Sequence, residues 1–451
     1  MIVLWAYVFL CKGGCGMIRK IRSSLLLCLG ILLGALLSGC TFNSTAESLF
    51  TLPQLPIEYT DLSRQISELI ADGYEYASPA SGRNIQSVQM VDLDGDGDEE
   101  AVAFFRRSSD EKPLKIFIFR ANDDTYDRLC TIESSGTSVD GVSYRDLTGD
   151  GQLELVIGWR ISSDVQTVAV YHVAAEPAVL LQSGYVRYSI EELDGDGIPS
   201  LLLLRSDESG GSVAEFYSWR EDSMTAAYTT HLSGTMADLT QGGVVSGKLD
   251  EETPAVFVTG VNAENVAVTD VLIFRQGSGL VNVAIDRWTG SSGVAFPYMQ
   301  LRPQDINGDG ITEIPSPASD PVSDGLIHWL QLDSYGKTKV VSTTYHSASG
   351  GWYFTLPQEW RDRVNVESYE ISANEWQLLI QVDRKAVAAV YTLTGENREN
   401  RAMRGNRVIL RRQTATVYAG EILFYGADWD LTEDFLRQNF HLTVQQWTNL
   451  S

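Results

Sequence analysis

The feature that most constrains this chain is a short acidic motif that recurs along much of its length. The best copies read DLDGDGDEE from Asp92, DLTGDGQLE from Asp146 and DINGDGITE from Asp305. Another copy, ELDGDGIPS from Glu192, ends in serine where the others have an acid, and a worn copy lies around Asp250. The copies begin 46 to 57 residues apart, and a period of this length indicates a repeated structural unit.

Each copy is followed by an apolar run and then by two or three further strand-like runs, such as 114–119 and 166–172, with turn residues between them. Four short strands in each of five units predict a mainly β fold, a β-propeller of about five blades over residues 57–345. Five or six blades would both close the ring. A stacked solenoid is the alternative, although its repeats are usually shorter. Helical spacing over 61–72 predicts one helix ahead of the propeller.

The motif has the spacing of a calcium loop. Alternate residues of a tight loop point toward one centre, so oxygens at positions 1, 3 and 5 converge, glycine at position 6 permits the turn, and an acid at position 9 closes the cage. The predicted ligands are Asp92, Asp94, Asp96, Asp98 and Glu100 in the first loop; Asp146, Thr148, Asp150 and Glu154 in the second; Glu192, Asp194 and Asp196 in the third; and Asp305, Asn307, Asp309 and Glu313 in the fifth.

The motif has two alternatives to a calcium cage. An EF-hand needs a glutamate at position 12 between flanking helices, and the loops instead have Ala103, Ile157, Leu203 and Ser316 there, followed by strands. The other alternative is that DGDG is only a turn sequence. Repetition with the position-9 acid in phase favours structural Ca²⁺, because clustered carboxylates without a cation repel one another.

The loops resemble the FG-GAP or VCBS-type repeat, which forms the blades of integrin-like propellers. The resemblance covers about residues 85–345, and the fourth copy has lost most of the pattern. It implies cation-binding loops on one face of a propeller, with a role in adhesion or recognition.

Residues 17–40 have the pattern of an export signal, with a basic start, a 13-residue apolar run and the sequence LSGC ending at Cys40. This ending matches the lipobox of bacterial lipoproteins, which implies a lipid on Cys40, a signal peptide over 1–40 and anchoring to a membrane outside the cytoplasm. An ordinary signal peptide or a short anchor helix is the alternative. We expect translation to start at Met17, and residues 41–56 to form a tether.

The charge, the cysteines and the arginines of the chain narrow the classes of partner that it can bind. A net charge of −25 argues against nucleic acid as a partner, and Cys130 is expected to be a buried strand residue. Residues 346–451 predict a small α+β domain. Its six arginines are either a patch for anionic polymers or headgroups, or a solvated hairpin: Arg398, Arg401, Arg404, Arg407, Arg411 and Arg412.

The sequence contains no HExxH pattern, no G-x-S-x-G elbow and no P-loop, so no catalytic residue is predicted. We therefore expect a cell-surface binding module that recognises an extracellular protein or glycan. The alternative is an extracellular hydrolase of polysaccharide or phosphoester with the propeller as scaffold. A part in assembling an envelope complex would differ from the first function only in its partner.

Overall fold

The computed structural model describes residues 59–122, 125–236, 239, 243–262, 266–294, 301–318, 325–347, 350–424 and 431–443. The chain divides into a unit of residues 1–63 and a unit of residues 64–451. The predicted signal peptide, the lipid attachment site at Cys40 and the tether lie outside the described residues. None of the helices in the described ranges is long and apolar enough to cross a membrane.

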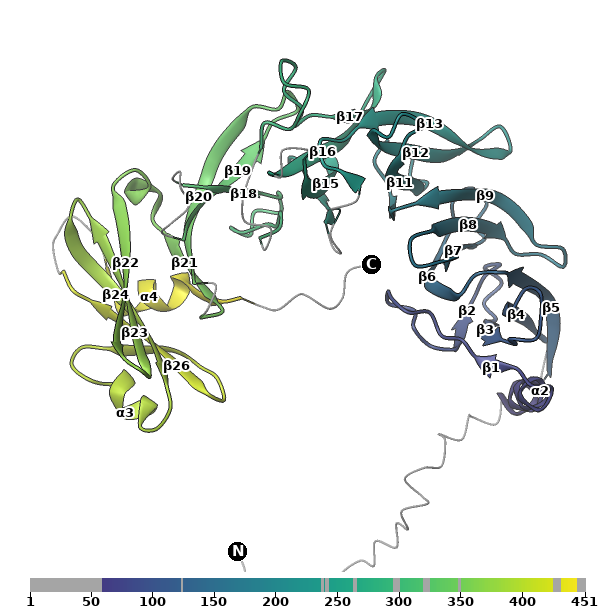
Figure 1. The fold of residues 1–451 in the computed structure, drawn as a ribbon, viewed down its shortest axis with the longest axis horizontal. Coiled ribbons are helices and arrows are strands. Elements are labelled where there is room, and N and C mark those ends of the chain that lie inside the picture. The colour runs from purple at the N-terminus through teal and green to yellow at the C-terminus, as the bar shows by residue number, and fades with distance from the viewer. Residues whose placement is uncertain are drawn as a thin grey trace, which may run out of the picture. The chain divides into compact units, whose positions relative to one another are not determined.

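The structure is mainly β, and the strands of the described residues form six antiparallel sheets (Figure 1). Helix α2 (Thr60–Ala71) precedes them, as its apolar spacing predicts. The first sheet contains β1 (Glu75–Tyr76), β2 (Val88–Val91), β3 (Glu100–Arg106), β4 (Leu114–Asn122) and β5 (Thr125–Ser134). The second contains β6 (Ser138–Arg145), β7 (Glu154–Arg160), β8 (Gln166–His172) and β9 (Ala178–Tyr185).

The next two sheets repeat the same four-stranded meander, in which each strand pairs with the next along the chain. The third contains β10 (Arg187–Glu191), β11 (Ser200–Ser206), β12 (Ser212–Arg220) and β13 (Ser223–His231). The fourth contains β14 (Val244–Lys248), β15 (Pro254–Val261), β16 (Ala267–Arg275) and β17 (Gly279–Asn282).

The fifth sheet includes strands from the region that the sequence assigns to the C-terminal domain. Strand β21 pairs with β20 in register, from Thr343 opposite Leu356 to Ser347 opposite Trp352, and β27 adds to its other edge. The predicted domain boundary at residue 345 therefore falls inside β20. The sheet contains β18 (Ile314–Pro317), β19 (Leu326–Leu332), β20 (Thr338–Ser347), β21 (Trp352–Leu356) and β27 (Phe440–Leu442).

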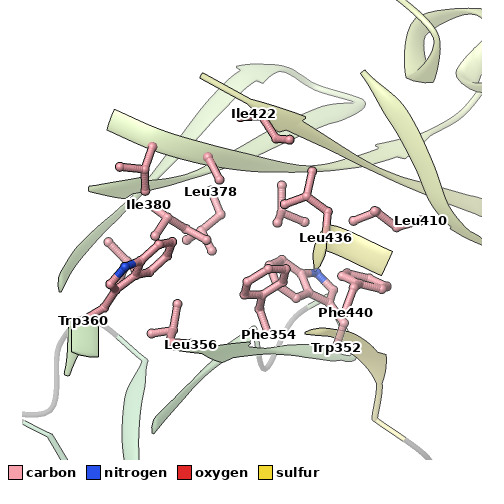
Figure 2. Packing of buried hydrophobic residues seen from close by; sticks show 14 of the residues in the cluster. Trp352, Phe354, Leu356, Trp360, Leu378, Ile380, Leu410, Ile422, Leu436 and Phe440 are labelled. Carbon is pink, nitrogen blue, oxygen red and sulfur yellow. The ribbon is translucent and has the colours of Figure 1, made fainter. Parts of the chain in front are cut away.

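The sixth sheet packs against the end of the fifth through a shared apolar core (Figure 2). Trp352, Phe354 and Phe440 lie on one side of this core, and Leu436 of the short helix α4 lies between them and the sixth sheet. The elements here are the 3-10 turn η4 (Gln358–Trp360), β22 (Val364–Ser372), β23 (Glu375–Val382), β24 (Lys385–Thr394), α3 (Arg398–Ala402), β25 (Val408–Arg412), β26 (Thr416–Ile422) and α4 (Glu433–Asn439).

Each of these sheets packs against the next one through a shared apolar core. Alternate side chains of one strand contribute to the cores on its two faces. In β7, Leu155 and Ile157 pack in a cluster with Val102 and Phe104 of the first sheet, whereas the intervening Val156 packs with Leu201 and Leu203 of the third. Successive strand residues point to opposite faces, so a strand buried on both faces reads as a continuous apolar run. The third and fourth sheets, and the fourth and fifth, share clusters in the same way.

Candidate metal centres

The acidic motif occupies the same place in each repeat, ahead of the first long apolar strand. It joins β2 to β3, β6 to β7 and β10 to β11, and it precedes β18, where Gln304 and Glu313 form an isolated bridge. The worn fourth copy joins β14 to β15. The repeat of the acidic motif in the sequence therefore corresponds to a repeat of loop and strand in the structure.

The first aspartate of the motif holds the loop closed through backbone amides. In the first loop its carboxylate accepts hydrogen bonds from the N–H groups of Gly95 (2.8 Å) and Gly97 (3.1 Å). Asp146 and Asp305 accept the same pair of bonds in the second and fifth loops. Gly95 and Gly97 have φ of 75° and 96°, a region that L side chains rarely adopt, which explains the two glycines of the motif.

The acid at position 9 is a buried charged group. Glu100, Glu154 and Glu313 are 1%, 0% and 0% exposed, and each accepts the backbone N–H of position 2 at 2.7 to 3.0 Å. Burial raises the pKa of Glu100 and of Glu313 above the ordinary value, against the lowering effect of these hydrogen bonds. Positive charge close to a carboxylate buried in this way would further favour its ionised form.

The residue at position 3 carries an oxygen that the structure leaves without a hydrogen-bond partner. Oδ1 of Asp94, Oγ1 of Thr148 and Oδ1 of Asp194 are all buried and unpaired. Buried polar atoms in proteins are nearly always hydrogen-bonded, so three unpaired oxygens at equivalent places are a specific feature of these loops. In the fifth loop Asn307 instead accepts from the N–H of Asp309 and donates to its carboxylate.

Two loops bring three acids together tightly. One oxygen each of Asp92, Asp94 and Glu100 lie within 4.8 Å of one another, and the same holds for Glu192, Asp194 and Asp196. Calcium–oxygen bonds are about 2.4 Å long, so two ligands on opposite sides of one ion are about 4.8 Å apart. The described residues show no such three-acid group in the second and fifth loops, where Thr148 and Asn307 hold position 3.

The remaining predicted ligands lie in the loops without joining a three-acid group. Asp96 and Asp150 accept the N–H of the residue two positions on, at 2.9 Å in both cases. Asp309 does the same at 2.8 Å, and its pKa is lowered because the hydrogen bonds from Ile311, Asn307 and Gln331 outweigh its partial burial. Asp98 is exposed, and the structure shows only its N–H in use.

A further group of polar side chains faces the loops, and none of them is among the ligands predicted from the sequence. These residues sit near the end of the strand that pairs with the one after the loop. Arg120 donates to Asp94 (2.7 Å), His172 lies 3.1 Å from Glu154, and Gln331 donates to Glu313 (2.7 Å). In the third repeat Arg220 lowers the pKa of Asp194, although burial raises it more. The signal was a polar residue closing each apolar run, as in IFIFR, VAVYH and HWLQ.

The fourth copy is a plain turn. Asp250 accepts the N–H groups of Glu252 (3.1 Å) and Thr253 (2.8 Å), and Leu249 donates to the carbonyl of Thr253. The turn lacks both glycines and the position-9 acid. Position 1 of this copy is Lys248 and Asp250 falls at position 3, so this loop is not a candidate metal centre.

The arginines of the C-terminal region are largely bound within the structure. Arg401 and Arg407 both pair with the buried Glu375, at 3.4 and 2.8 Å, and the guanidinium of Arg407 lies over the ring of Tyr391. Arg412 pairs with Glu399, and Arg398 donates to two backbone carbonyls. Cys130, as expected, is a buried free thiol in β5, and burial raises its pKa to about 11.

Comparison with known proteins gives no family for this chain. No family model matches it, and no curated protein matches it. A solved structure described as a hypothetical protein from Leishmania major aligns with 9% sequence identity over 61% of this chain and 97% of that one, with a TM-score of 0.23. A similarity at that level supports no statement about fold or function.

Proposed function

We propose that this chain is a non-catalytic binding module in which calcium ions brace the repeated sheets of a β-propeller. The observation that carries the proposal is the buried, unpaired oxygen at position 3 of three loops, on Asp94, Thr148 and Asp194. A hard cation is the natural partner for such oxygens when carboxylates and backbone groups surround them. Ca²⁺ fits the donor set, which consists of oxygen alone.

The propeller part of the proposal is supported by the way the sheets pack. Four-stranded meanders that bury both faces against the preceding and the following sheet are what successive blades of a propeller require. Each blade would place its calcium loop at the same edge, because the loop always precedes the first long apolar strand of its sheet. We propose about five such blades.

The acids of these loops are suited to structure and not to hydrolysis. A general acid or a nucleophile needs access to substrate, and Glu154 and Glu313 have no exposed surface. The first-position carboxylates of Asp92, Asp146 and Asp305 each accept two backbone N–H groups of their own loop. Bound calcium would hold the loop shape and neutralise the buried glutamate.

We further propose that the module is held at a membrane outside the cytoplasm through a lipid on Cys40, where it recognises an extracellular ligand. The sequence LSGC after a 13-residue apolar run supports this placement. Millimolar calcium outside the cell suits loops of moderate affinity.

Calorimetric titration of the chelator-stripped protein with Ca²⁺, and with Mg²⁺ as control, tests the proposal. We expect saturable calcium binding and a rise in melting temperature, with a weaker response to magnesium because that ion demands a smaller octahedral site. The variant D194N should remove one binding event and leave the others. Release of sugar or phosphate from model polysaccharides and phosphoesters would contradict the non-catalytic part.

A further inference from the structure

Two aromatic side chains stand almost fully in solvent. Trp288 is 95% exposed and Tyr335 is 89% exposed, whereas rings of this size normally bury most of their surface. Among the described residues no other large hydrophobic side chain exceeds 57% exposure. Both rings therefore call for a functional explanation.

Trp288 is presented by a loop that its hydrogen bonds make rigid. The carboxylate of Asp286 accepts the N–H groups of Trp288 (2.8 Å) and Thr289 (3.0 Å), and the N–H of Asp286 donates to the carbonyl of Ser291 (2.9 Å). A β-bridge between Ile285 and Ser292 closes the base of the loop. The ring is thus held out on a fixed support.

Tyr335 is presented in the same manner by the turn between β19 and β20. The carboxylate of Asp333 accepts the N–H groups of Tyr335 and Lys337, both at 2.9 Å. The N–H of Asp333 donates to the carbonyl of Lys337 at 3.0 Å, which closes the turn. Two aspartates hold two exposed rings with the same chemistry.

The two supports are in contact with each other. A Cβ on Gly336 would lie 2.2 Å from the carbonyl oxygen of Val283, so the turn packs directly on the backbone that leads into the Trp288 loop. Arg275 also donates to the carbonyl of Ser334. Trp288 is five residues beyond Val283, and at no more than about 3.6 Å per residue its Cα lies within about 18 Å of Val283.

Each ring has a cation close to it in the sequence, Arg287 next to Trp288 and Lys337 two residues after Tyr335. Arg287 and Lys337 are exposed, and the part of the chain that the structure describes contains no ion pair to either of them. The neighbouring carboxylates of Asp286 and Asp333 are directed to backbone amides. In a chain of net charge −25, two unpaired cations next to two exposed rings form a local site for negative charge.

We propose that Trp288 and Tyr335 form a platform that binds an acidic polysaccharide, with the rings stacking on sugar faces and with Arg287 and Lys337 pairing with its carboxylates. This inference rests on the proposed binding function and gives its ligand class. The two loops also carry polar residues next to the rings in the sequence, such as Thr289 and Ser334, which suits a hydroxylated chain. A protein interface has at its core a contiguous apolar patch.

Calorimetry and tryptophan fluorescence with a hyaluronan decasaccharide, which carries carboxylates, test this platform on the full chain. Cellohexaose, a neutral glycan, is the control ligand. We expect hyaluronan to bind at least tenfold more tightly than cellohexaose, and more weakly as salt is raised. The variants W288A and Y335A should each lose at least tenfold in affinity, and R287Q/K337Q should lose the preference for the acidic glycan.

The control variant is W376A, since Trp376 of β23 is an exposed tryptophan outside these loops. Its affinity should equal that of the unaltered chain. Undiminished hyaluronan binding by W288A, equal binding of the neutral glycan, or binding of neither glycan would overturn the inference. Running each titration with calcium and with chelator separates the two proposals, because calcium uptake is measured independently of the glycan.

Discussion

The first and fifth sheets carry nearly the same acidic loop in different surroundings. In both, an aspartate closes the loop on two glycine amides and a buried glutamate accepts the N–H of position 2. In the first sheet Arg120 faces the acids with a guanidinium, whereas in the fifth sheet Gln331 faces them with a neutral amide. The difference teaches that the same motif can lie beside a positive charge of the protein or beside a neutral group, and only the second arrangement leaves the charge balance to the proposed calcium ion.

The two sheets also differ in their titratable neighbours. No histidine precedes His172 in the sequence, so the first sheet has none. The fifth sheet contains His328, His346 and His441, and the pKa of each is lowered by burial. The ring of Tyr353 is stacked between His346 (centroids 5.1 Å apart) and His441 (4.7 Å). Acid should therefore affect the fifth sheet before the first.

The largest expected effect comes from removing the buried glutamates. In calcium, E100A and E313A should each lower the free energy of unfolding by about 3 kcal/mol, because a buried N–H loses its acceptor and the cation loses a ligand. In chelator the loss from E100A should persist, since Arg120 still balances Glu100 in the unaltered chain. In chelator the loss of unfolding free energy caused by E313A should be smaller than in calcium, because Glu313 of the unaltered chain then has no cation to balance it. Chemical denaturation measures both.

The matched control is E99A, which removes the exposed acid next to Glu100. It should change stability by no more than about 0.5 kcal/mol. Equal losses for E100A and E313A in chelator would show that Arg120 does not substitute for calcium, and the comparison between the two sheets would then fail.

The next effect concerns pH. The pKa of His346 is lowered to about 4 by burial, below its ordinary value of about 6.5 in the unfolded chain. The folded state therefore binds fewer protons between these values, and stability is lost as pH falls from about 6.5 to about 4, by on the order of 3 kcal/mol. Melting curves of the unaltered chain and of H346F, recorded in chelator over this pH range, measure the loss of stability.

H346F keeps a ring against Tyr353 and cannot take up a proton, so its melting temperature should fall less over this pH range. Hydrogen exchange should show acid opening in β20 before β3. Identical pH profiles for H346F and the unaltered chain would contradict the role of His346.

The smallest expected effect is on calcium affinity, when the residue that faces each loop is exchanged for its counterpart in the other sheet. R120Q should raise calcium affinity at the first loop about tenfold, which corresponds to about 1.4 kcal/mol, because a guanidinium 2.7 Å from Asp94 no longer competes. Q331R should lower affinity at the fifth loop by a similar factor. Arg120 is partly exposed, so solvent limits the size of both changes. Site-resolved calcium titration by NMR would measure them, and a fall in affinity for R120Q would contradict the competition.

Much of the secondary structure could be predicted from local pattern. The run 352–356 is β21, and Thr432 caps α4 by accepting the N–H of Phe435 at 3.1 Å. Strand β23 ends at Val382, because Asp383 and Arg384 both have positive φ and form the hairpin turn. These features depend on residues close in sequence.

The rest depended on pairing between distant segments. Strand β27 joins the fifth sheet more than 80 residues after β21, counted from Leu356 to Phe440. Nothing in the sequence around Gln331 says that its amide meets Glu313, since this contact follows from strand register. The position-9 acids could be recognised from the motif, but their complete burial and the unpaired oxygens at position 3 required the folded arrangement.

The most direct measurement of the central claim is an anomalous difference map at long wavelength from crystals grown in saturating Ca²⁺. The account predicts peaks within about 2.6 Å of Oδ1 of Asp94 and Oδ1 of Asp194, and a further peak at the fifth loop beside Glu313. A map with no peak at any of these oxygens, with all the loops still folded, would contradict it.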